Sequence, residues 1–318
     1  MIVSASYRTD IPALYGAWFM SRLQAGFAHV HNPYGGPPTT VSLSRSAVDA
    51  FVFWTRNLGP FAPALDAVAG RGFPFLVQYT VTGYPRPLER ATPAPEIAIA
   101  HIRAAAARYG SGTVVWRYDP IVCTTLTPPE WHVSTFTRLA RMLAGTLDEV
   151  IVSWCQIYRK TARNLDAAAR ASGFTWWDPE EEEKRALLGR LAAIAAEHGM
   201  RLTLCGQPNL QTDGVGEARC IDAERLGRIA GAPLSIRHHA HRKQCGCWAS
   251  RDIGAYDSCT QGCAYCYAVN SPAAAKRRHA RHDPQAAFLI PAAGKADQSC
   301  SSTRRPAAVP PAASDGCS

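Results

Sequence analysis

The chain has 318 residues, of which 47% are hydrophobic and 19% charged, with a net charge of +9. This composition is typical of a globular protein with one or two domains. It contains no run of about 18 uninterrupted apolar residues, which excludes a membrane-spanning helix. Residues 1–6 lack the basic and apolar regions of a signal peptide. We therefore expect a cytoplasmic protein with no membrane partner.

Cysteine is abundant, with 11 residues. In a cytoplasmic chain of this length, clustered cysteines indicate metal or redox chemistry more often than disulfides. Between Arg237 and His282, eight Lys or Arg residues stand against two Asp residues, so much of the positive charge lies around the cysteines. This charge indicates an anionic partner near them, with nucleic acid as one candidate.

Short apolar segments alternate with helical patterns through residue 240, as in proteins built on a buried parallel sheet. The expected strands are residues 2–6, 51–55, 75–82, 114–118, 150–155, 201–205 and 234–237. The expected helices are residues 11–25, 95–109, 130–144 and 179–198, the last of them capped by Asp178. The alternation predicts an α/β fold, either a complete or partial (β/α) barrel of parallel strands or a doubly wound sheet.

Three parts are expected along the chain. Residues 1–240 form the barrel-like domain, and residues 241–290 form a cysteine-rich, cluster-binding segment packed on it. Residues 291–318 are rich in Pro, Ala and Ser and are expected to be a disordered tail. The chain contains neither a GxGxxG motif after a strand nor a P-loop motif, so nucleotide binding of these two kinds has no support.

The most specific motif is formed by Cys259, Cys263 and Cys266, with the spacing C-x3-C-x2-C. Thiolates on one tight loop can converge on a single metal cluster, and as soft ligands they suit iron–sulfur clusters or zinc. A zinc ion would need a fourth ligand, which His279 or His282 could supply. A 4Fe-4S cluster with three cysteine ligands would keep one iron open for another ligand.

This motif resembles the signature of the radical S-adenosylmethionine enzymes. In that superfamily three cysteines hold a 4Fe-4S cluster, and the fourth iron binds the amino and carboxylate groups of S-adenosylmethionine. Residues 262–268 (GCAYCYA) are similar to the spore photoproduct lyase-like branch. The resemblance implies that Tyr265 packs against the adenine region of the cofactor.

A second resemblance covers residues 1–290 and is to domain-of-unknown-function family 1848, whose members carry the label DNA repair photolyase. It is carried by residues 4–12 (SASYRTDIP), 53–57 (FWTRN), 116–120 (WRYDP) and 245–259 (CGCWASRDIGAYDSC).

The position of the motif departs from the pattern of the radical enzymes. Their cysteine loop follows the first strand of the barrel, whereas here it lies near the C-terminus. A circular permutation reconciles the two, because residues 2–6 resemble the second strand of the lyase-like branch. The missing first strand is then expected near residues 250–256, just before the cysteines.

Polar residues follow the expected strands at the edge where barrels place their sites. The residues concerned are Thr9, Asp10, Arg56, Arg117 and Asp119. If S-adenosylmethionine binds there, the two arginines bind a carboxylate or phosphate, and the carboxylates bind ribose or an amine. The alternative interpretation is that these residues form helix caps and surface ion pairs.

Four further cysteines form a possible second metal site: Cys205, Cys220, Cys245 and Cys247. Four thiolates would complete a closed second 4Fe-4S cluster or a structural zinc site. The resemblance favours this grouping. The alternative is that Cys205 and Cys220 are small buried hydrophobic residues.

Together these features predict a radical S-adenosylmethionine enzyme. It would generate a 5′-deoxyadenosyl radical that abstracts hydrogen from an unknown substrate, and it would require an external electron donor. Two alternatives remain open. One is a non-catalytic iron–sulfur or zinc protein that binds nucleic acid, and the other is an electron-transfer protein with two clusters.

Overall fold

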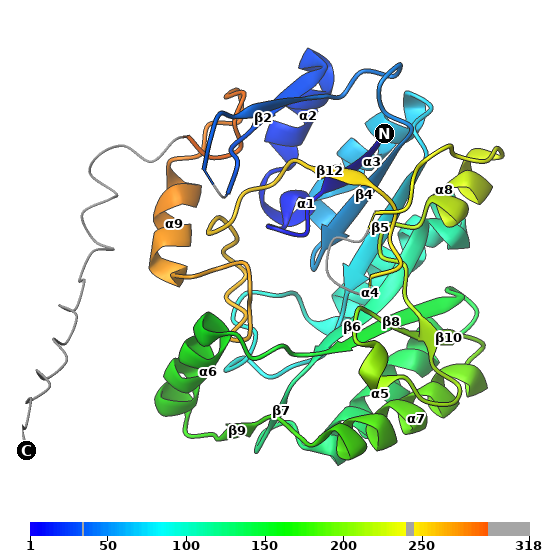
Figure 1. The fold of residues 1–318 in the computed structure, drawn as a ribbon, viewed down its shortest axis with the longest axis vertical. Helices are drawn as coiled ribbons and strands as arrows, with labels where there is room; N and C mark the ends of the chain where they lie inside the picture. The colour runs from blue at the N-terminus through cyan, green and yellow to red at the C-terminus, as the bar shows by residue number, and fades with distance from the viewer. Residues whose placement is uncertain (34, 240–244, 292–318) are drawn as a thin grey trace, which may run out of the picture.

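The computed structural model describes residues 1–33, 35–239 and 245–291. Its central element is a parallel sheet of eight strands (Figure 1). From one edge to the other the strands are β11 (Gly216–Glu217), β10 (Arg201–Leu204), β8 (Glu149–Trp154), β6 (Val114–Ile121), β5 (Phe75–Thr80), β4 (Ala50–Thr55), β1 (Ile2–Ala5) and β12 (Ser250–Asp252). The predicted parallel sheet is thereby confirmed.

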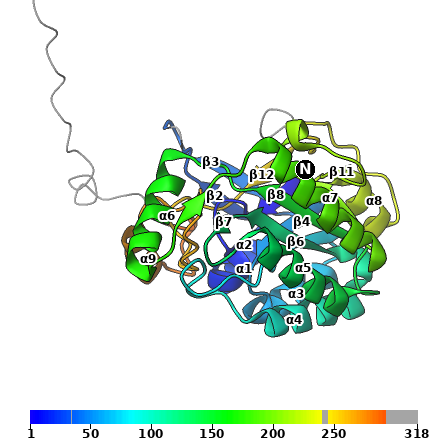
Figure 2. The same cartoon turned by 90° about the horizontal axis from the view of Figure 1, so that it is seen from below.

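Helices cover one face of this sheet, and Figure 2 shows α3, α4, α5 and α7 along its side. The described helices are α1 (Ile11–Leu14), α2 (Gly16–Ala25), α3 (Ala62–Gly70), α4 (Pro95–Tyr109), α5 (Pro129–Leu143), α6 (Arg159–Ser172), α7 (Glu181–Glu197), α8 (Ala223–Ala230) and α9 (Pro272–Ala280). Short 3-10 helices η1 (Gly59–Phe61), η2 (Ser111–Thr113) and η3 (Pro208–Leu210) lie between them. In the part of the chain described here, no helix is long and apolar enough to cross a membrane.

Successive strand residues point to opposite faces of the sheet. Val3, Phe53 and Val77 lie in the main core with the helices. Ile2 and Val52 lie in a separate apolar cluster on the other face. That second cluster also contains the start of α8 and the cysteine segment before β12, so the two faces have different coverings.

The order of strands decides between the two predicted architectures. From β1 to β11 the strands follow one another across the sheet in chain order, and β12 alone is added at the opposite edge. Crossovers that always advance in one direction place their helices on one face, because parallel connections share a right-handed sense. A doubly wound sheet would reverse its order. Since β11 and β12 are the two ends of this sheet, the fold is a partial (β/α) barrel rather than a complete one.

The strand expected near residues 250–256 is confirmed. β12 pairs in parallel with β1, with Ile2 opposite Ser250 and Ser4 opposite Asp252. The carboxyl end of β12 therefore points to the same edge of the sheet as those of β1 and β4, and the cysteine motif follows on that edge.

Three local predictions were wrong. Residues 234–237 are not a strand, and the Arg237 carbonyl accepts a hydrogen bond from the Ala249 amide just before β12. Residues 11–25 form two helices instead of one, because Tyr15 adopts a non-helical conformation between them. Glu180 rather than Asp178 caps α7, in a reciprocal capping box with Glu183.

Two small antiparallel sheets were not anticipated: β2 (Phe27–Val30) with β3 (Thr39–Ser42), and β7 (Cys123–Thr124) with β9 (Trp176–Trp177). The expected tail, apart from residue 291, lies outside the described residues, as do residues 241–244 of the cysteine-rich segment.

Candidate metal centre

Residues 259–266, here named the cysteine loop, lie at the carboxyl edge of the sheet and contact the segment that follows β5. The Ala91 amide donates to the Gln261 carbonyl at 3.0 Å, and the Ala264 amide donates to the Leu88 carbonyl at 2.9 Å. Cys263 forms an antiparallel bridge with Glu89. The loop is thus held by backbone hydrogen bonds on both sides of its central cysteine.

Asp10 joins this loop to β4 and to α1. Its carboxylate accepts hydrogen bonds from Thr55 Oγ1 at 2.8 Å, the Arg56 amide at 2.9 Å and Gln261 Nε2 at 3.1 Å. It also caps α1 through the Ala13 amide. Burial raises the pKa of Asp10, and these hydrogen bonds oppose the rise. The residue predicted to contact a cofactor therefore organises the site in the structure.

The remaining predicted residue on β1's carboxyl side, Thr9, is also tied to the cysteine loop region. Ser258, which precedes Cys259, donates from Oγ to Thr9 Oγ1 at 2.8 Å. Ser258 also accepts a hydrogen bond on its carbonyl from the Tyr15 hydroxyl at 2.6 Å. His279 and His282, the candidate zinc ligands, pack edge-on against the Tyr15 ring.

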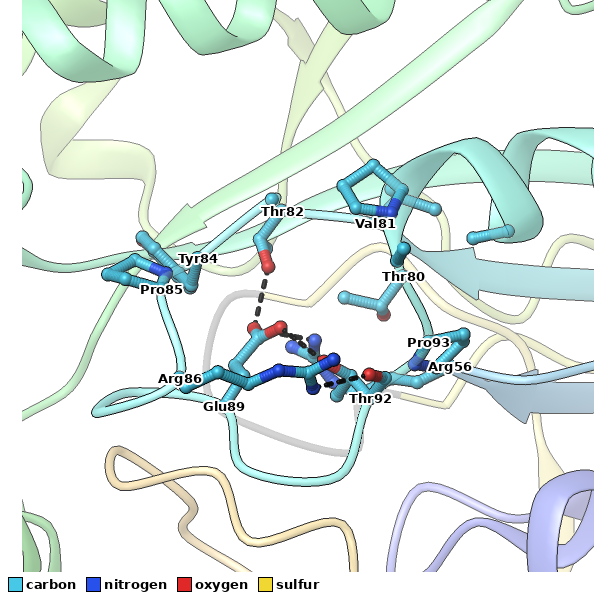
Figure 3. A pocket seen from close by; sticks show the side chains of 14 residues that line it. Arg56, Thr80, Val81, Thr82, Tyr84, Pro85, Arg86, Glu89, Thr92 and Pro93 are labelled. Atoms are coloured by element: carbon cyan, nitrogen blue, oxygen red, sulfur yellow. Dashed lines mark hydrogen bonds and ion pairs between the residues drawn. The ribbon is translucent and has the colours of Figure 1, made fainter.

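A buried polar cluster of Arg56, Glu89 and Tyr265 forms the wall beside Cys263. Arg56 Nη1 lies 2.6 Å from Glu89 Oε1, and Arg56 Nη2 donates to the Tyr265 hydroxyl at 2.5 Å. The Tyr265 hydroxyl in turn donates to Glu89, which also accepts from Thr82 Oγ1 at 2.6 Å. Figure 3 shows Arg56 and Thr82 meeting the Glu89 carboxylate in a cavity of about 200 Å³. Tyr84 lines the same cavity.

The three cysteines of the loop are partly exposed residues with free thiols. Burial of its sulfur raises the pKa of Cys263 to about 12, while the Arg56 guanidinium opposes the rise. Burial also raises the pKa values of Cys259 and Cys266, and for Cys259 the negative charge of Asp10 adds to the effect. Without a metal these thiols are neutral at pH 7, and a bound cation is what would favour their thiolate forms.

The other two predicted cofactor-binding residues lie elsewhere. Arg117 Nε donates to Asp119 at 3.0 Å, and Nη1 lies 3.1 Å from the Cys220 sulfur. Arg117 also stacks over the Trp54 ring. The structure thus separates the predicted set into two groups. Thr9, Asp10, Arg56 and Tyr265 lie with the cysteine loop, whereas Arg117 and Asp119 lie with the second set of cysteines.

That second set, here named the Cys205 group, consists of Cys205, Cys220, Cys245 and Cys247. The sulfurs of Cys205 and Cys220 are 3.2 Å apart. Cys220 is hydrogen-bonded to Cys247, and Cys247 to Cys245. Hydrogen bonds from Cys205 and Cys247, assisted by Arg117, lower the pKa of Cys220 well below its ordinary value. The four thiols come together from three chain segments.

Within residues 1–33, 35–239 and 245–291, no three His, Cys, Asp or Glu side chains already surround a common point as metal ligands do. The cysteine loop holds its three thiols on one short segment, and the Cys205 group holds its four in a chain of contacts. Among the described residues, neither set is therefore arranged as a finished metal site.

Sequence reasoning missed two buried carboxylates, Glu89 and Asp252. Asp252 accepts hydrogen bonds from the hydroxyls of Ser4 at 2.8 Å and Ser6 at 2.7 Å and from the Tyr7 amide at 3.0 Å. It thereby fastens β12 to the end of β1. Asp252 could have been found from the sequence, because it lies in the strand that was expected just before the cysteines. Glu89 follows no strand directly, so its role could not be read from the sequence.

The fold and these cysteines define an α/β protein with a partial parallel barrel and two separate sets of clustered thiols. The model of the family described as Domain of unknown function (DUF1848) matches residues 2–268, so the chain belongs to this family. No curated protein and no solved structure matches the chain.

Proposed function

We propose that the chain is a radical S-adenosylmethionine enzyme whose 4Fe-4S cluster is held by Cys259, Cys263 and Cys266. The observation that carries this proposal is the position of β12. This strand is the last in the described part of the chain but pairs with the first strand, β1, at the edge of the sheet, and the three cysteines follow its carboxyl end. This is the arrangement that a circularly permuted member of that superfamily would have.

The residues at this site suit such a cluster. The ligands are three soft thiols on one loop, a set that leaves one coordination position for another ligand. Arg56 and Lys160 both act on Cys266 as positive charges, which would offset part of the negative charge of a thiolate-bound cluster. A bound cluster, reduced by an external donor, would supply the electron that cleaves S-adenosylmethionine to the 5′-deoxyadenosyl radical.

The protein's own contribution is to position the cysteine loop and to limit the access of water. Asp10 holds the loop through Gln261, and the Glu89 carboxylate holds Arg56 and Tyr265 beside Cys263. Because Tyr265 is buried, its ring forms a fixed wall next to the last cysteine. This wall and the Arg56 guanidinium are the groups that we expect to contact the bound cofactor.

Anaerobic reconstitution with iron and sulfide tests the proposal. The wild-type protein should show 4Fe-4S absorbance and release 5′-deoxyadenosine from S-adenosylmethionine and dithionite. Cys263→Ala should reduce that release at least about 100-fold, because the cluster loses one of its protein ligands. Cys123→Ala is the matched control, since Cys123 is a buried cysteine in the small sheet of β7 and β9.

Three outcomes would contradict the proposal. Cleavage that persists in Cys263→Ala would show that the ligand assignment is wrong. A colourless protein containing only zinc would favour the nucleic-acid-binding alternative. Two reducible clusters that leave S-adenosylmethionine intact would favour the electron-transfer alternative.

The substrate of the proposed reaction is open. Lys276 and Arg277 are exposed on α9, so part of the positive charge expected around the cysteines lies on that helix. Nucleic acid is therefore one candidate substrate. Retention of the protein on single-stranded DNA that weakens with salt and with Lys276→Glu would support it, and salt-independent passage would exclude it.

A further inference from the structure

The Cys205 group lies on the face of the sheet opposite the main helical layer. Cys205 follows β10, Cys220 precedes α8, and Cys245 and Cys247 lie just before β12. Cys220 and Cys247 are 5% and 3% exposed, so their thiols are shielded from solvent. They lie in the apolar cluster formed with Ile2 and Val52.

We infer that the Cys205 group binds a single zinc ion in a closed tetrahedral site. Four cysteines from three segments form the ligand set of a structural zinc site, in which no position stays open. With zinc–sulfur bonds of about 2.3 Å, the sulfurs around a tetrahedral ion lie about 3.8 Å apart. The observed 3.2 Å between the Cys205 and Cys220 sulfurs is near this spacing.

The same distance disfavours a second 4Fe-4S cluster. Each thiolate of such a cluster binds a different iron, so the inorganic core separates the sulfurs well beyond direct contact. Here Cys220 contacts both Cys205 and Cys247, and Cys247 contacts Cys245. A single zinc ion fits among sulfurs that are in contact. It requires that Cys205 and Cys245, which lie at the two ends of this chain of contacts, turn toward the ion.

The groups around these sulfurs resemble the surroundings of a thiolate site. The Ile221 amide donates to the Cys247 sulfur at 3.4 Å, and Arg117 Nη1 donates to the Cys220 sulfur at 3.1 Å. Gln78 Nε2 donates to the Cys220 carbonyl at 2.9 Å, which fixes the backbone that carries this ligand. Such outer hydrogen bonds orient metal ligands and stabilise their charge. Arg117, which is 5% exposed, therefore has a positioning role at this site.

The inferred ion has a structural purpose. Cys247 lies three residues before β12, and the Trp248 amide donates to the Ile221 carbonyl at 3.1 Å. An ion shared by these segments would fix the approach of the chain to β12. It would thus hold β12 against β1, and through β12 the cysteine loop.

Metal analysis of the full-length protein tests the inference without relying on activity. The purified wild-type chain should contain one zinc per chain before iron reconstitution, and Cys220→Ser should lose most of it. Cys263→Ala should keep its zinc and lose its iron, whereas Cys123→Ser should keep both. This pattern separates the inference from the proposed function, since the two depend on different metals bound to different cysteines.

If Cys220→Ser does not fold, the wild-type protein grown with Co²⁺ provides a second measurement. Tetrahedral thiolate coordination should give the intense visible absorption of Co²⁺ bound to four sulfurs. Two results would overturn the inference: iron at twice the content of a single cluster, with no zinc, or disulfides among the Cys205 group in protein alkylated under anaerobic conditions.

Discussion

The two sets of cysteines are assembled in opposite ways. The cysteine loop takes its three thiols from one short segment at the edge of the sheet, and each residue is partly exposed. The Cys205 group takes four thiols from three segments, and Cys220 and Cys247 are buried beneath the sheet. The first arrangement is local to one loop, and the second joins distant parts of the chain.

The difference shows that spacing in the sequence and closeness in space carry separate information. Three cysteines within eight residues come close together when their segment forms a tight loop, so their spacing alone predicts a site. Cys205 and Cys247 are neighbours only because β10, α8 and the segment before β12 meet on one face. The first kind of cluster can therefore be recognised from sequence alone, whereas the second is recognised only once the fold is known.

The sharpest test of the comparison uses one glycine on each side of β12, Gly246 on the side of the Cys205 group and Gly254 on the side of the cysteine loop. A Cβ atom on Gly254 would lie 2.6 Å from Ser6 Cβ and would overlap the Ser6 hydroxyl, where neither group can move away. A Cβ on Gly246 would meet only the Glu217 carboxylate, at 2.6 Å, which is the flexible end of an exposed side chain. We expect Gly254→Ala to lower the free energy of unfolding by about 3 kcal/mol and Gly246→Ala to change it little.

Urea unfolding of both variants measures this contrast. Equal losses in the two variants would show that β12 and the segment before it respond as one unit, and the proposed separation of the two regions would fail.

Lowering the pH provides a second test, because it separates the stability of the helical core from metal binding at the two cysteine sets. His132 is buried on α5, accepts from the Tyr118 hydroxyl and donates to the Val122 carbonyl, and burial lowers its pKa to about 4. The unfolded chain binds this proton near pH 6.5, so the stabilisation is complete above that pH and is lost as the pH falls toward 4. The loss should reach about 3 kcal/mol.

Unfolding free energies measured between pH 7 and 4.5 should therefore fall in the wild type and fall less in His132→Gln. Metal release from each cysteine set can then be followed in that variant without global unfolding. Parallel curves for the two proteins would show that His132 is not the acid-sensitive group.

Arg117 distinguishes the two cysteine sets, because it contacts only the Cys205 group among them in the described structure. Arg117→Met keeps the length of the side chain but removes the hydrogen bond to the Cys220 sulfur. Zinc affinity, measured by competition with a chromophoric chelator, should fall about 10- to 100-fold, as for other outer-shell partners. Iron bound by the cysteine loop should not change. Loss of iron with retained zinc would place Arg117 with the cofactor instead.

The smallest effect is expected at Tyr265. Tyr265→Phe removes a hydroxyl that joins Arg56 to Glu89 but keeps the buried ring. We expect a loss of about 1 kcal/mol in stability with unchanged iron content. Tyr158→Phe is the control, since Tyr158 is 44% exposed. Loss of the cluster in Tyr265→Phe would show that the hydroxyl, rather than the ring, supports the site.

Much of the fold could be predicted because it depends on local patterns. The apolar runs that became β1, β4, β5, β6, β8 and β10 are buried on both faces, and such runs are readable one segment at a time. Residues 234–237 have a similar pattern but pair with the segment before β12 instead, because partner choice depends on the whole molecule. The short strand β12 was predictable only from a resemblance, since three residues carry little pattern of their own.

The cysteine loop could be predicted in the same local way, but its surroundings could not. Arg56, Glu89 and Tyr265 come from three separate regions of the sequence and meet through a buried ion pair and hydrogen bonds. Asp10 and Arg56 also bind the protein's own groups, and these contacts could not be predicted from the sequence. Only the assembled sheet edge shows which polar residues hold the site and which remain for a ligand.

The late position of β12 also affects how the protein must be made. Until the ribosome has passed residue 252, β1 presents one unpaired edge, with its amides and carbonyls available to any extended chain nearby. Truncated chains that end before residue 252 would contain nearly the whole sheet but would expose the unpaired edge of β1. Such fragments should self-associate or require chaperones, whereas in the full chain β1 is paired on both sides, with β4 and β12.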